Sequence, residues 1–328
     1  MGELTRRAVT IALVGAAAGV RSAGARDPGR PARIGLLTAQ RPAAIAPYLP
    51  ILRAGLADEG FVEGRNLTIE YRYGEDSRER TRDLARELAD LPVDLVVTQG
   101  TAVGLVAQMN LAVPIVFVIS SDPIASGFAE SLSRPIGNKT GLTFMAFEFA
   151  SKRLEMLREL MPAIERVTVL GNPEHLGTES ERAFAEATGR RSGLDVGFCG
   201  MSVPSDIDAA CARMVRDRAQ AIALLTDSFA VQNREVLLDF ARGQNLPVVS
   251  GWPVFAESGA LFTYGPRLSA SYRRLAYYVG RILRGTRATD LPIERPSVFH
   301  TVVNLSTARR LGIEVPRAFL ARADEVIE

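Results

Sequence analysis

The sequence is short of the residues on which many enzymes and metalloproteins depend. It contains two histidines and two cysteines in 328 residues, and none of them has the spacing of zinc ligands. His175 and His300 stand far apart in the chain, and we interpret both as surface or packing residues. Cys199 and Cys211 could form a disulfide in an exported protein, but two unpaired, partly buried thiols are the simpler interpretation.

Motifs for nucleotide binding and for nucleophilic catalysis are also missing. There is no G-x-S-x-G elbow and no Walker loop, and the stretch "LLTAQRP" at the first predicted strand offers no glycine turn for a pyrophosphate. The net charge of +2 is too small to demand a nucleic-acid partner. We therefore expect no catalytic residues, no cofactor and no metal, and no nucleic acid as a partner.

A hydrophobic run long enough to anchor the protein is absent, since the uncharged run over residues 8–20 is too short to span a bilayer. Arg6 and Arg7 precede this run, and the small residues 23–25 follow it. This order is typical of a secretory signal peptide. We expect residues 1–25 to be removed on export, by the general secretory or the twin-arginine route. No cysteine lies near the cleavage point, so we expect a periplasmic protein that is neither lipid-anchored nor embedded in the membrane.

From residue 32 onward, short apolar runs alternate with amphipathic segments, which predicts a parallel sheet covered by helices on both faces. The expected strands are 33–37, 67–72, 94–98, 115–119 and 140–144, and the expected helices are 45–59, 78–90, 101–110 and 124–133.

The same alternation restarts after Phe144, which predicts a second lobe of similar size. Its expected strands are 166–170, 194–199, 221–225, 247–250 and 260–264, and its expected helices are 151–161, 178–190, 206–217 and 229–243.

Three expected elements are left over once the second lobe is complete: a helix over 269–285, a strand at 300–305 and a last helix. Gly285 ends the first of these helices. We infer that the chain crosses back between the lobes, with connections near 145–149, 264–268 and 290–298.

Small polar residues follow the predicted strands where each strand ends. In doubly wound sheets, ligands bind outside these carboxyl ends. Helix capping explains each loop by itself, because Thr101, Asp122, Asn172 and Asp227 are all competent N-caps. Five loops that face one gap between two lobes indicate a pocket for a small ligand. The loops are Thr38-Ala39-Gln40, Gln99-Gly100-Thr101, Ser120-Ser121-Asp122-Pro123, Gly171-Asn172-Pro173-Glu174 and Thr226-Asp227-Ser228.

These loops offer hydroxyls, amides and main-chain donors for a small polar ligand, and a carboxylate such as that of Asp227 could pair with an ammonium group. Aromatic residues near the rims could form an apolar wall or stack on a ring, or else pack in the core and hinge. They are Phe144, Phe147, Phe229, Trp252 and Tyr264.

At this point the chain resembles a known family, the ABC transporter substrate-binding proteins of the type I periplasmic fold, in the branch that includes tryptophan- and tyrosine-type binding proteins. The resemblance covers nearly all of the mature chain. It is carried by "LADEGFVEGRNLTIEYRYGE" (56–75), "VPIVFVISSDPIASGFAESLSRPIGNKTGLT" (113–143), "KRLEMLRELMPAIERVTVLGNP" (152–173), "FAESGALFTYG" (255–265) and the segment from 290 to 328.

The resemblance implies two Rossmann-like lobes with parallel sheets, joined by a three-segment hinge, with the ligand enclosed between them. It implies an N-terminal lobe of residues 32–146 plus 267–290 and a C-terminal lobe of residues 147–266 plus 291–328. We add Phe144 and Trp252 from the aromatic residues above to the ligand contacts that it implies. Those contacts are Ala39, Gln40, Gln99, Gly100, Thr101, Ser121, Asp122, Asn172, Pro173, Glu174 and Asp227.

The chain departs from the family pattern at one place. Relatives that bind amino acids often have a serine-rich or asparagine-rich stretch after the Asn-Pro pair, where this chain has "EHLGTES". The groups that hold a ligand carboxylate are therefore open, and so is the ligand itself, for which an amino acid is the first hypothesis and a branched or aromatic carboxylate the second.

The function that the resemblance implies is capture of a small ligand by hinge closure, without chemistry, for an ABC permease and its ATPase. We expect a monomer. Two alternatives stay open: a binding protein that feeds a sensor or receptor, and a two-lobed enzyme acting on a sugar or nucleotide.

Overall fold

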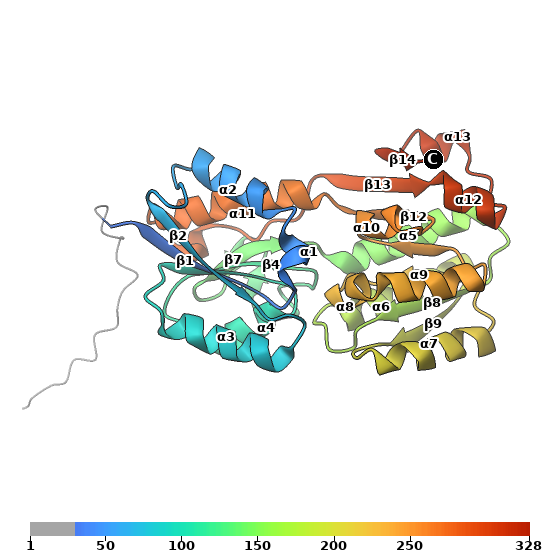
Figure 1. Cartoon of the computed structure of the whole chain (residues 1–328), viewed down its shortest axis with the longest axis horizontal. Helices are drawn as coiled ribbons and strands as arrows, with labels where there is room; N and C mark the ends of the chain where they lie inside the picture. The colour runs from blue at the N-terminus through green and yellow to red at the C-terminus, as the bar shows by residue number, and fades with distance from the viewer. Residues whose placement is uncertain (1–29) are drawn as a thin grey trace, which may run out of the picture.

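The computed structural model describes residues 30–328, so the predicted signal peptide at 1–25 lies outside the described residues. The chain forms two α/β lobes side by side (Figure 1). The α/β class with two lobes is therefore confirmed. The first sheet has the order β2-β1-β3-β4-β7 and is parallel throughout. Its strands are β1 (Ala32–Thr38), β2 (Leu67–Tyr73), β3 (Leu95–Gln99), β4 (Ile115–Ile119) and β7 (Lys139–Thr143).

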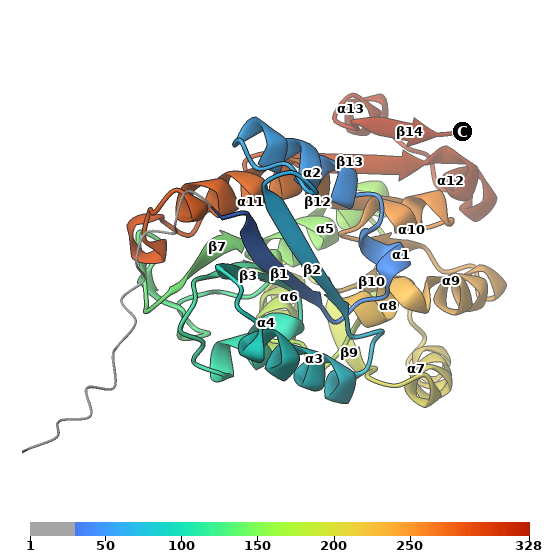
Figure 2. The same cartoon turned by 60° about the vertical axis from the view of Figure 1, so that its left-hand side comes forward.

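Helices cover both faces of the first sheet, as Figure 2 shows. On one face, α3 (Arg78–Asp90) and α4 (Ala102–Gln108) bury a cluster that includes Leu88. On the other face, α2 (Leu49–Asp58) and α11 (Leu268–Leu283) bury a cluster that includes Leu275. The apolar stripes of these helices face the sheet, which explains why strands buried on both faces read as continuous apolar runs.

The second sheet has the order β14-β13-β12-β11-β10-β8-β9. It departs from an all-parallel sheet at one pair, because β13 runs antiparallel to β12. β12 ends at the junction between the lobes and β13 begins there, so the two strands must run in opposite directions. The strands are β8 (Arg166–Gly171), β9 (Asp195–Gly200), β10 (Ala221–Leu224), β11 (Val248–Ser250), β12 (Phe262–Pro266), β13 (Phe299–Asn304) and β14 (Glu325–Ile327).

The second lobe also has a hydrophobic cluster on each face of its sheet. The first cluster includes residues of α5 (Ala146–Leu160), α6 (Thr178–Ser192), α12 (Leu305–Leu311) and α13 (Arg317–Leu320). The second includes residues of α7 (Ser205–Arg216), α8 (Ser228–Gln232), α9 (Arg234–Gly243) and α10 (Pro253–Glu257).

The helix expected over residues 124–133 is wrong. The chain there forms turns and a short hairpin of β5 (Ala129–Ser131) and β6 (Arg134–Pro135). Asp122 Oδ1 accepts a hydrogen bond at 2.8 Å from the backbone N–H two residues later, and Gly127 has φ +72°. A side-chain turn followed by a left-handed glycine replaces the first helical turns.

Two expected helices differ from the prediction. The one at 45–59 begins later, as α2, and a separate short helix α1 (Pro42–Ile45) precedes it, whereas the one at 229–243 is divided into α8 and α9 at Asn233. The Asn233 side chain donates to Phe229 O at 2.9 Å, so a side-chain bond competes with the helical ladder at this break.

The chain passes between the lobes near 144–146, near 266–268 and over 291–298. Backbone hydrogen bonds tie these segments together: Glu294 donates to Gly141 O at 3.0 Å, and Arg267 donates to Val298 O at 3.0 Å. Before the last crossing, α11 ends in a Schellman motif at Gly285, with φ +98°, in which Thr286 N donates to Arg281 O at 3.1 Å. The lobe boundaries given above stay a prediction.

The close approach of β4 and β7 generates the first testable prediction. Gly141 has φ +151°, and a Cβ there would lie 2.0 Å from Phe117 O. We expect Gly141→Ala to lower the free energy of unfolding by about 3 kcal/mol, because the backbone of β4 must move. Denaturant unfolding followed by circular dichroism measures the loss.

Gly197→Ala is the control, because Gly197 also lies in a parallel strand but has no atom within 4 Å of the added Cβ. We expect this change to stay within about 0.5 kcal/mol of the parent. Equal stabilities of the two variants would contradict the prediction.

Candidate functional site

The carboxyl ends of β1 and β3 carry a connected set of polar side chains. Gln99 Nε2 donates to Gln40 Oε1 at 3.0 Å, and Gln99 Oε1 accepts from the Tyr272 hydroxyl at 2.6 Å. The Gln40 backbone N–H donates to Thr38 Oγ1 at 3.2 Å, and Ala39 lies between them. The structure thus brings Gln40 and Gln99 together and adds Tyr272 of α11, which the sequence interpretation missed.

The next loops of the first lobe have defined local roles. Gly100 has φ +59°, which the turn from β3 into α4 requires. Thr101 precedes α4, but its side chain does not cap the helix. Ser121 is 3% exposed, and its hydroxyl lies 3.0 Å from that of Ser126. Asp122 forms the side-chain turn described above and does not cap a helix.

Asp227 is the most unusual of the predicted residues. It lies after β10, and its side chain is buried, at 5% exposure. Its Oδ1 caps α8 by accepting a hydrogen bond from the backbone N–H of Ala230 at 3.0 Å. Its Oδ2 is buried and has no hydrogen-bond partner within residues 30–328. Burial raises the pKa of Asp227 to about 6. A buried carboxylate oxygen without a partner is costly, although the backbone N–H groups of Ala230, Phe229 and Asn172 lower the pKa of this carboxyl and so oppose the effect of burial. A ligand contact of Asp227 stays a prediction.

The loop after β8 lies partly outside this enclosed region. Asn172 Oδ1 accepts from Glu174 N at 2.9 Å, which fixes the turn. Pro173 and Glu174 are exposed, and Glu174 forms an ion pair with Arg78 of the first lobe at 3.8 Å. The structure therefore does not place Pro173 and Glu174 among buried ligand groups, and their role stays a prediction.

An aromatic contact joins the lobes. The ring of Phe144, at the first crossing, meets the ring of Trp252 edge-on with centroids 5.8 Å apart. Tyr48 stacks on Tyr272 at 5.0 Å. Trp252 packs against the hydrophobic clusters of both lobes. These rings form an aromatic wall at the junction, and its contact with a ligand stays a prediction.

A buried charged network lies beneath the second rim, and the sequence interpretation missed it. Arg153 of α5 and Glu181 of α6 are each 1% exposed, with Arg153 Nη2 3.8 Å from Glu181 Oε2. Glu181 accepts both the backbone N–H of Thr226 at 3.2 Å and its hydroxyl at 2.8 Å. This holds the residue that precedes Asp227.

Burial shifts the pKa values of both charged residues in this network. It raises the pKa of Glu181 and lowers the pKa of Arg153, while the attraction between the two opposes both shifts. The signal was present in the sequence: Arg153 occupies the apolar stripe of its helix together with Ala150, Leu154 and Leu157.

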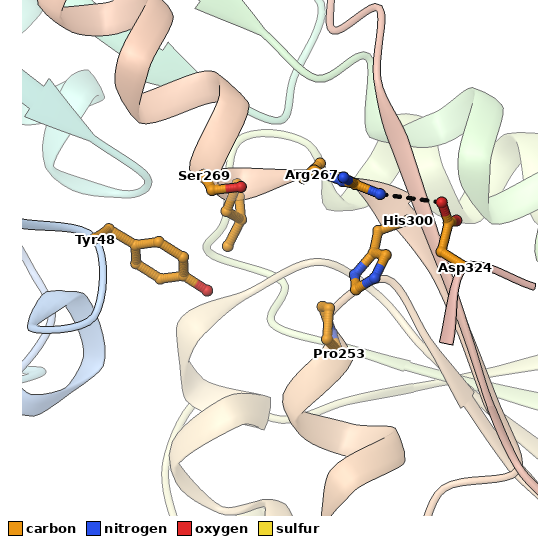
Figure 3. A pocket seen from close by; sticks show the side chains of 7 residues that line it. Tyr48, Pro253, Arg267, Ser269, His300 and Asp324 are labelled. Carbon is orange, nitrogen blue, oxygen red and sulfur yellow. Dashed lines mark hydrogen bonds and ion pairs between the residues drawn. The ribbon is translucent and has the colours of Figure 1, made fainter. Parts of the chain in front are cut away.

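Two cavities lie beside the junction and are lined by other residues. Figure 3 shows the first, of about 440 Å³, where Tyr48 faces Pro253 and His300 across the space. Its charged groups neutralise each other, since Arg267 Nη2 lies 3.0 Å from Asp324 Oδ1. The second, of about 380 Å³, includes Phe144 among its lining residues. The predicted loops do not line the first cavity, and of the predicted residues Phe144 lines the second.

Cys199 and Cys211 are both free, so the interpretation as unpaired thiols is confirmed. Within residues 30–328, no group of three or more His, Cys, Asp or Glu side chains is arranged to hold a metal ion. The same part of the chain has no helix with the length and hydropathy of a membrane span.

Comparisons with known proteins give one family model and several structures with a similar fold. A family model described as ABC transporter substrate binding protein matches residues 48–327. A tyrosine-binding protein of Clostridioides difficile (strain R20291) is 22% identical over 265 residues, covering 79% of this chain and 74% of that protein. Two solved structures, a conserved domain protein from Vibrio cholerae and an ABC domain in complex with L-Trp from Streptococcus pneumonia, are similar with TM-scores of 0.84 at 23% and 21% identity, covering 90% of this chain and 100% of each.

The buried charge pair generates a stability prediction. We expect Arg153→Leu to lower the free energy of unfolding by about 3 kcal/mol, because it leaves the Glu181 carboxyl buried without its cation. Adding Glu181→Gln should recover most of this loss, since the amide is neutral and its oxygen can still accept from Thr226. Denaturant unfolding at pH 7 checks both variants, and a double variant as unstable as the sum of the single changes would contradict the prediction.

The pKa of Asp227 generates a pH prediction. Its folded-state pKa, about 6 against an ordinary value of 3.8, means that the ionised carboxylate opposes folding as pH rises through this range. We expect the free energy of unfolding of Asp227→Asn to exceed that of the parent by an amount that grows between pH 4 and pH 6. Above pH 6 this difference should stay constant at about 3 kcal/mol. Unfolding of the ligand-free proteins across this range measures the difference, which a flat profile would contradict.

Proposed function

Because the chain belongs to the family of ABC transporter substrate-binding proteins, we propose that it captures a small amino-acid-type ligand between its lobes for an ABC importer. The observation that carries the proposal is the buried Oδ2 of Asp227, which has no hydrogen-bond partner within residues 30–328. An α-ammonium group supplies the charge and the donors that this oxygen lacks.

Polar groups of the first lobe complete a site for a zwitterion. Gln40 and Gln99 hold each other in place, and Thr101 and Ser121 add hydroxyls at the ends of β3 and β4. Uncharged hydrogen-bond donors of this kind can bind a ligand carboxylate, and burying them costs less desolvation free energy than burying a charged side chain. A ligand held by Asp227 on one lobe and by these groups on the other contacts both rims at once.

Such a ligand stabilises the closed arrangement through contacts that the open arrangement does not have, and this difference in affinity drives closure. The crossing segments provide the hinge, and Met145 at the first crossing has φ +48°. Binding and release need no covalent step, which agrees with the absence of nucleophile and nucleotide motifs in the sequence.

The aromatic wall favours a ligand with an apolar or aromatic side chain. Phe144, Trp252 and Tyr272 meet at the junction, and rings of this kind pack against a ligand ring in edge-on or stacked geometry. The names of two similar proteins, a tyrosine-binding protein and a domain in complex with L-Trp, support an aromatic amino acid as the first ligand to test.

We further propose that the mature protein acts in the periplasm after removal of residues 1–25 and hands its ligand to a membrane permease driven by an ATPase. The closed lobes are the form that the permease recognises. In this role the protein is not an enzyme, and its partners are the ligand and the transporter.

The proposed function predicts binding of L-tryptophan or L-tyrosine to the purified mature protein. A ligand that binds only the folded protein raises the melting temperature, and titration calorimetry gives the affinity. We expect Asp227→Asn to weaken this binding by about 100-fold, because the ammonium group loses a charged partner. The same variant should be more stable than the parent without ligand, so loss of binding cannot be ascribed to unfolding.

Asp195→Asn is the matched control, because Asp195 is an exposed carboxylate at the start of β9. Indole-3-propionate, which lacks the ammonium group, should bind weakly and equally to parent and Asp227→Asn. If all amino acids leave the melting temperature unchanged, the proposed ligand class is wrong.

A further inference from the structure

We propose that Ser120 and His175 form a latch across the cleft that sets how tightly the closed lobes hold their ligand. Ser120 directly follows β4 in the first lobe, and His175 lies in the loop after β8 in the second. Ser120 Oγ and His175 Nε2 are 3.0 Å apart. The role of the latch in ligand binding rests on the proposed function, but its effect on lobe closure can be measured without any ligand.

The direction of this hydrogen bond follows from the other ring nitrogen. His175 Nδ1 accepts the backbone N–H of Gly177 at 3.2 Å, and a backbone amide can only donate. Nδ1 therefore carries a lone pair, and in the neutral ring Nε2 carries the proton and donates to Ser120 Oγ. Burial lowers the pKa of His175 to about 4, so the ring is neutral at pH 7.

Both partners are buried in this arrangement, Ser120 at 7% and His175 at 8% exposure. The contact joins two lobes, so it forms only when they meet. In an open arrangement both groups are free to bind water, whereas in the closed one each depends on the other. The hydrogen bond therefore stabilises the closed arrangement relative to the open one, which is the requirement for control of closure.

The loop around His175 fits the first lobe at further points. A Cβ on Gly104 of α4 would lie 3.3 Å from Leu176 Cδ1, and a Cβ on Gly177 would lie 3.4 Å from Ser121 N. The first distance is tight and the second is an ordinary van der Waals contact, so the two rims pack closely at these points. By contrast, the ion pair between Arg78 and Glu174 is 60% and 62% exposed and contributes little.

The second-lobe partner of the latch lies in the stretch "EHLGTES", which follows Asn172-Pro173. His175 is the second residue of that stretch. The stretch therefore places a buried cross-lobe hydrogen-bond donor two residues after the Asn-Pro pair.

Ser120→Ala is the cleanest test, because the serine hydroxyl has the His175 ring as its described partner while the Ser120 carbonyl bonds elsewhere, to Ala146 N at 2.8 Å. We expect about ten-fold faster dissociation of L-tryptophan and about ten-fold weaker binding, since the His175 N–H is left buried without an acceptor. The melting temperature of the ligand-free protein should change little.

Two further variants separate a latch from a general loss of packing. His175→Asn can still accept from Gly177 N but is too short to reach Ser120, so we expect it to match Ser120→Ala, and the double variant should be no worse than either alone. Ser131→Ala is the matched control, because it removes a serine hydroxyl bonded within the first lobe, to Ser133 at 3.1 Å, and should behave as the parent.

Lobe closure is read directly from spin labels at Ala89→Cys in α3 and Ala212→Cys in α7, both exposed, after Cys199→Ala and Cys211→Ala. Double electron–electron resonance on the ligand-free protein should show a smaller closed fraction in Ser120→Ala than in Ser131→Ala. If L-tryptophan does not bind, the ligand assignment fails while the distance distributions still decide the latch. Identical closed fractions and identical dissociation rates in the two serine variants overturn it.

Discussion

The crossing segments between the lobes are the constraint on which the rest of the structure depends. Because the chain passes near 144–146, 266–268 and 291–298, elements far apart in sequence must share one junction. Glu294 bonds to the backbone of Gly141, and Thr143 bonds back to Glu294 O at 2.9 Å. These bonds tie the third crossing segment to β7 of the first sheet, beside the junction where the polar loops, the aromatic wall and the Ser120–His175 hydrogen bond lie.

Buried polar groups at this junction are of two kinds. Glu181 has the Arg153 charge and both Thr226 bonds, so this carboxylate holds a loop in place, although Arg153 Nε has no hydrogen-bond partner within residues 30–328. Asp227 Oδ2 lacks a partner within the described part of the chain and is therefore better suited to receive one from outside. The distinction rests on satisfaction of hydrogen bonds in a medium of low dielectric, where an unpaired oxygen is expensive and a paired one is merely rigid.

The failures of sequence interpretation have local causes. Asp122 looked like a helix cap, but its side chain closes a turn onto Ile124 N at 2.8 Å, and with Gly127 this diverts the chain from helix to hairpin. Asn172 likewise closes a turn instead of capping a helix, and Thr101 leaves α4 uncapped. Of the four candidate caps, Asp227 alone has a side chain that caps a helix. The same side chains serve turns and caps, and only the following backbone decides which.

The sequence by itself determined the alternation of strands and helices, the two lobes and the polar loops at the strand ends, because hydrophobic periodicity and strand direction are local properties. Only the tertiary structure decided which loop residues meet. Gln40 reaches Gln99 and Tyr272, Ser120 reaches His175, and Arg153 reaches Glu181 across separations that periodicity does not encode. The physical reason is that burial and partner choice depend on how the lobes pack, so a histidine that reads as an ordinary packing residue becomes a cross-lobe donor once the rims are in contact.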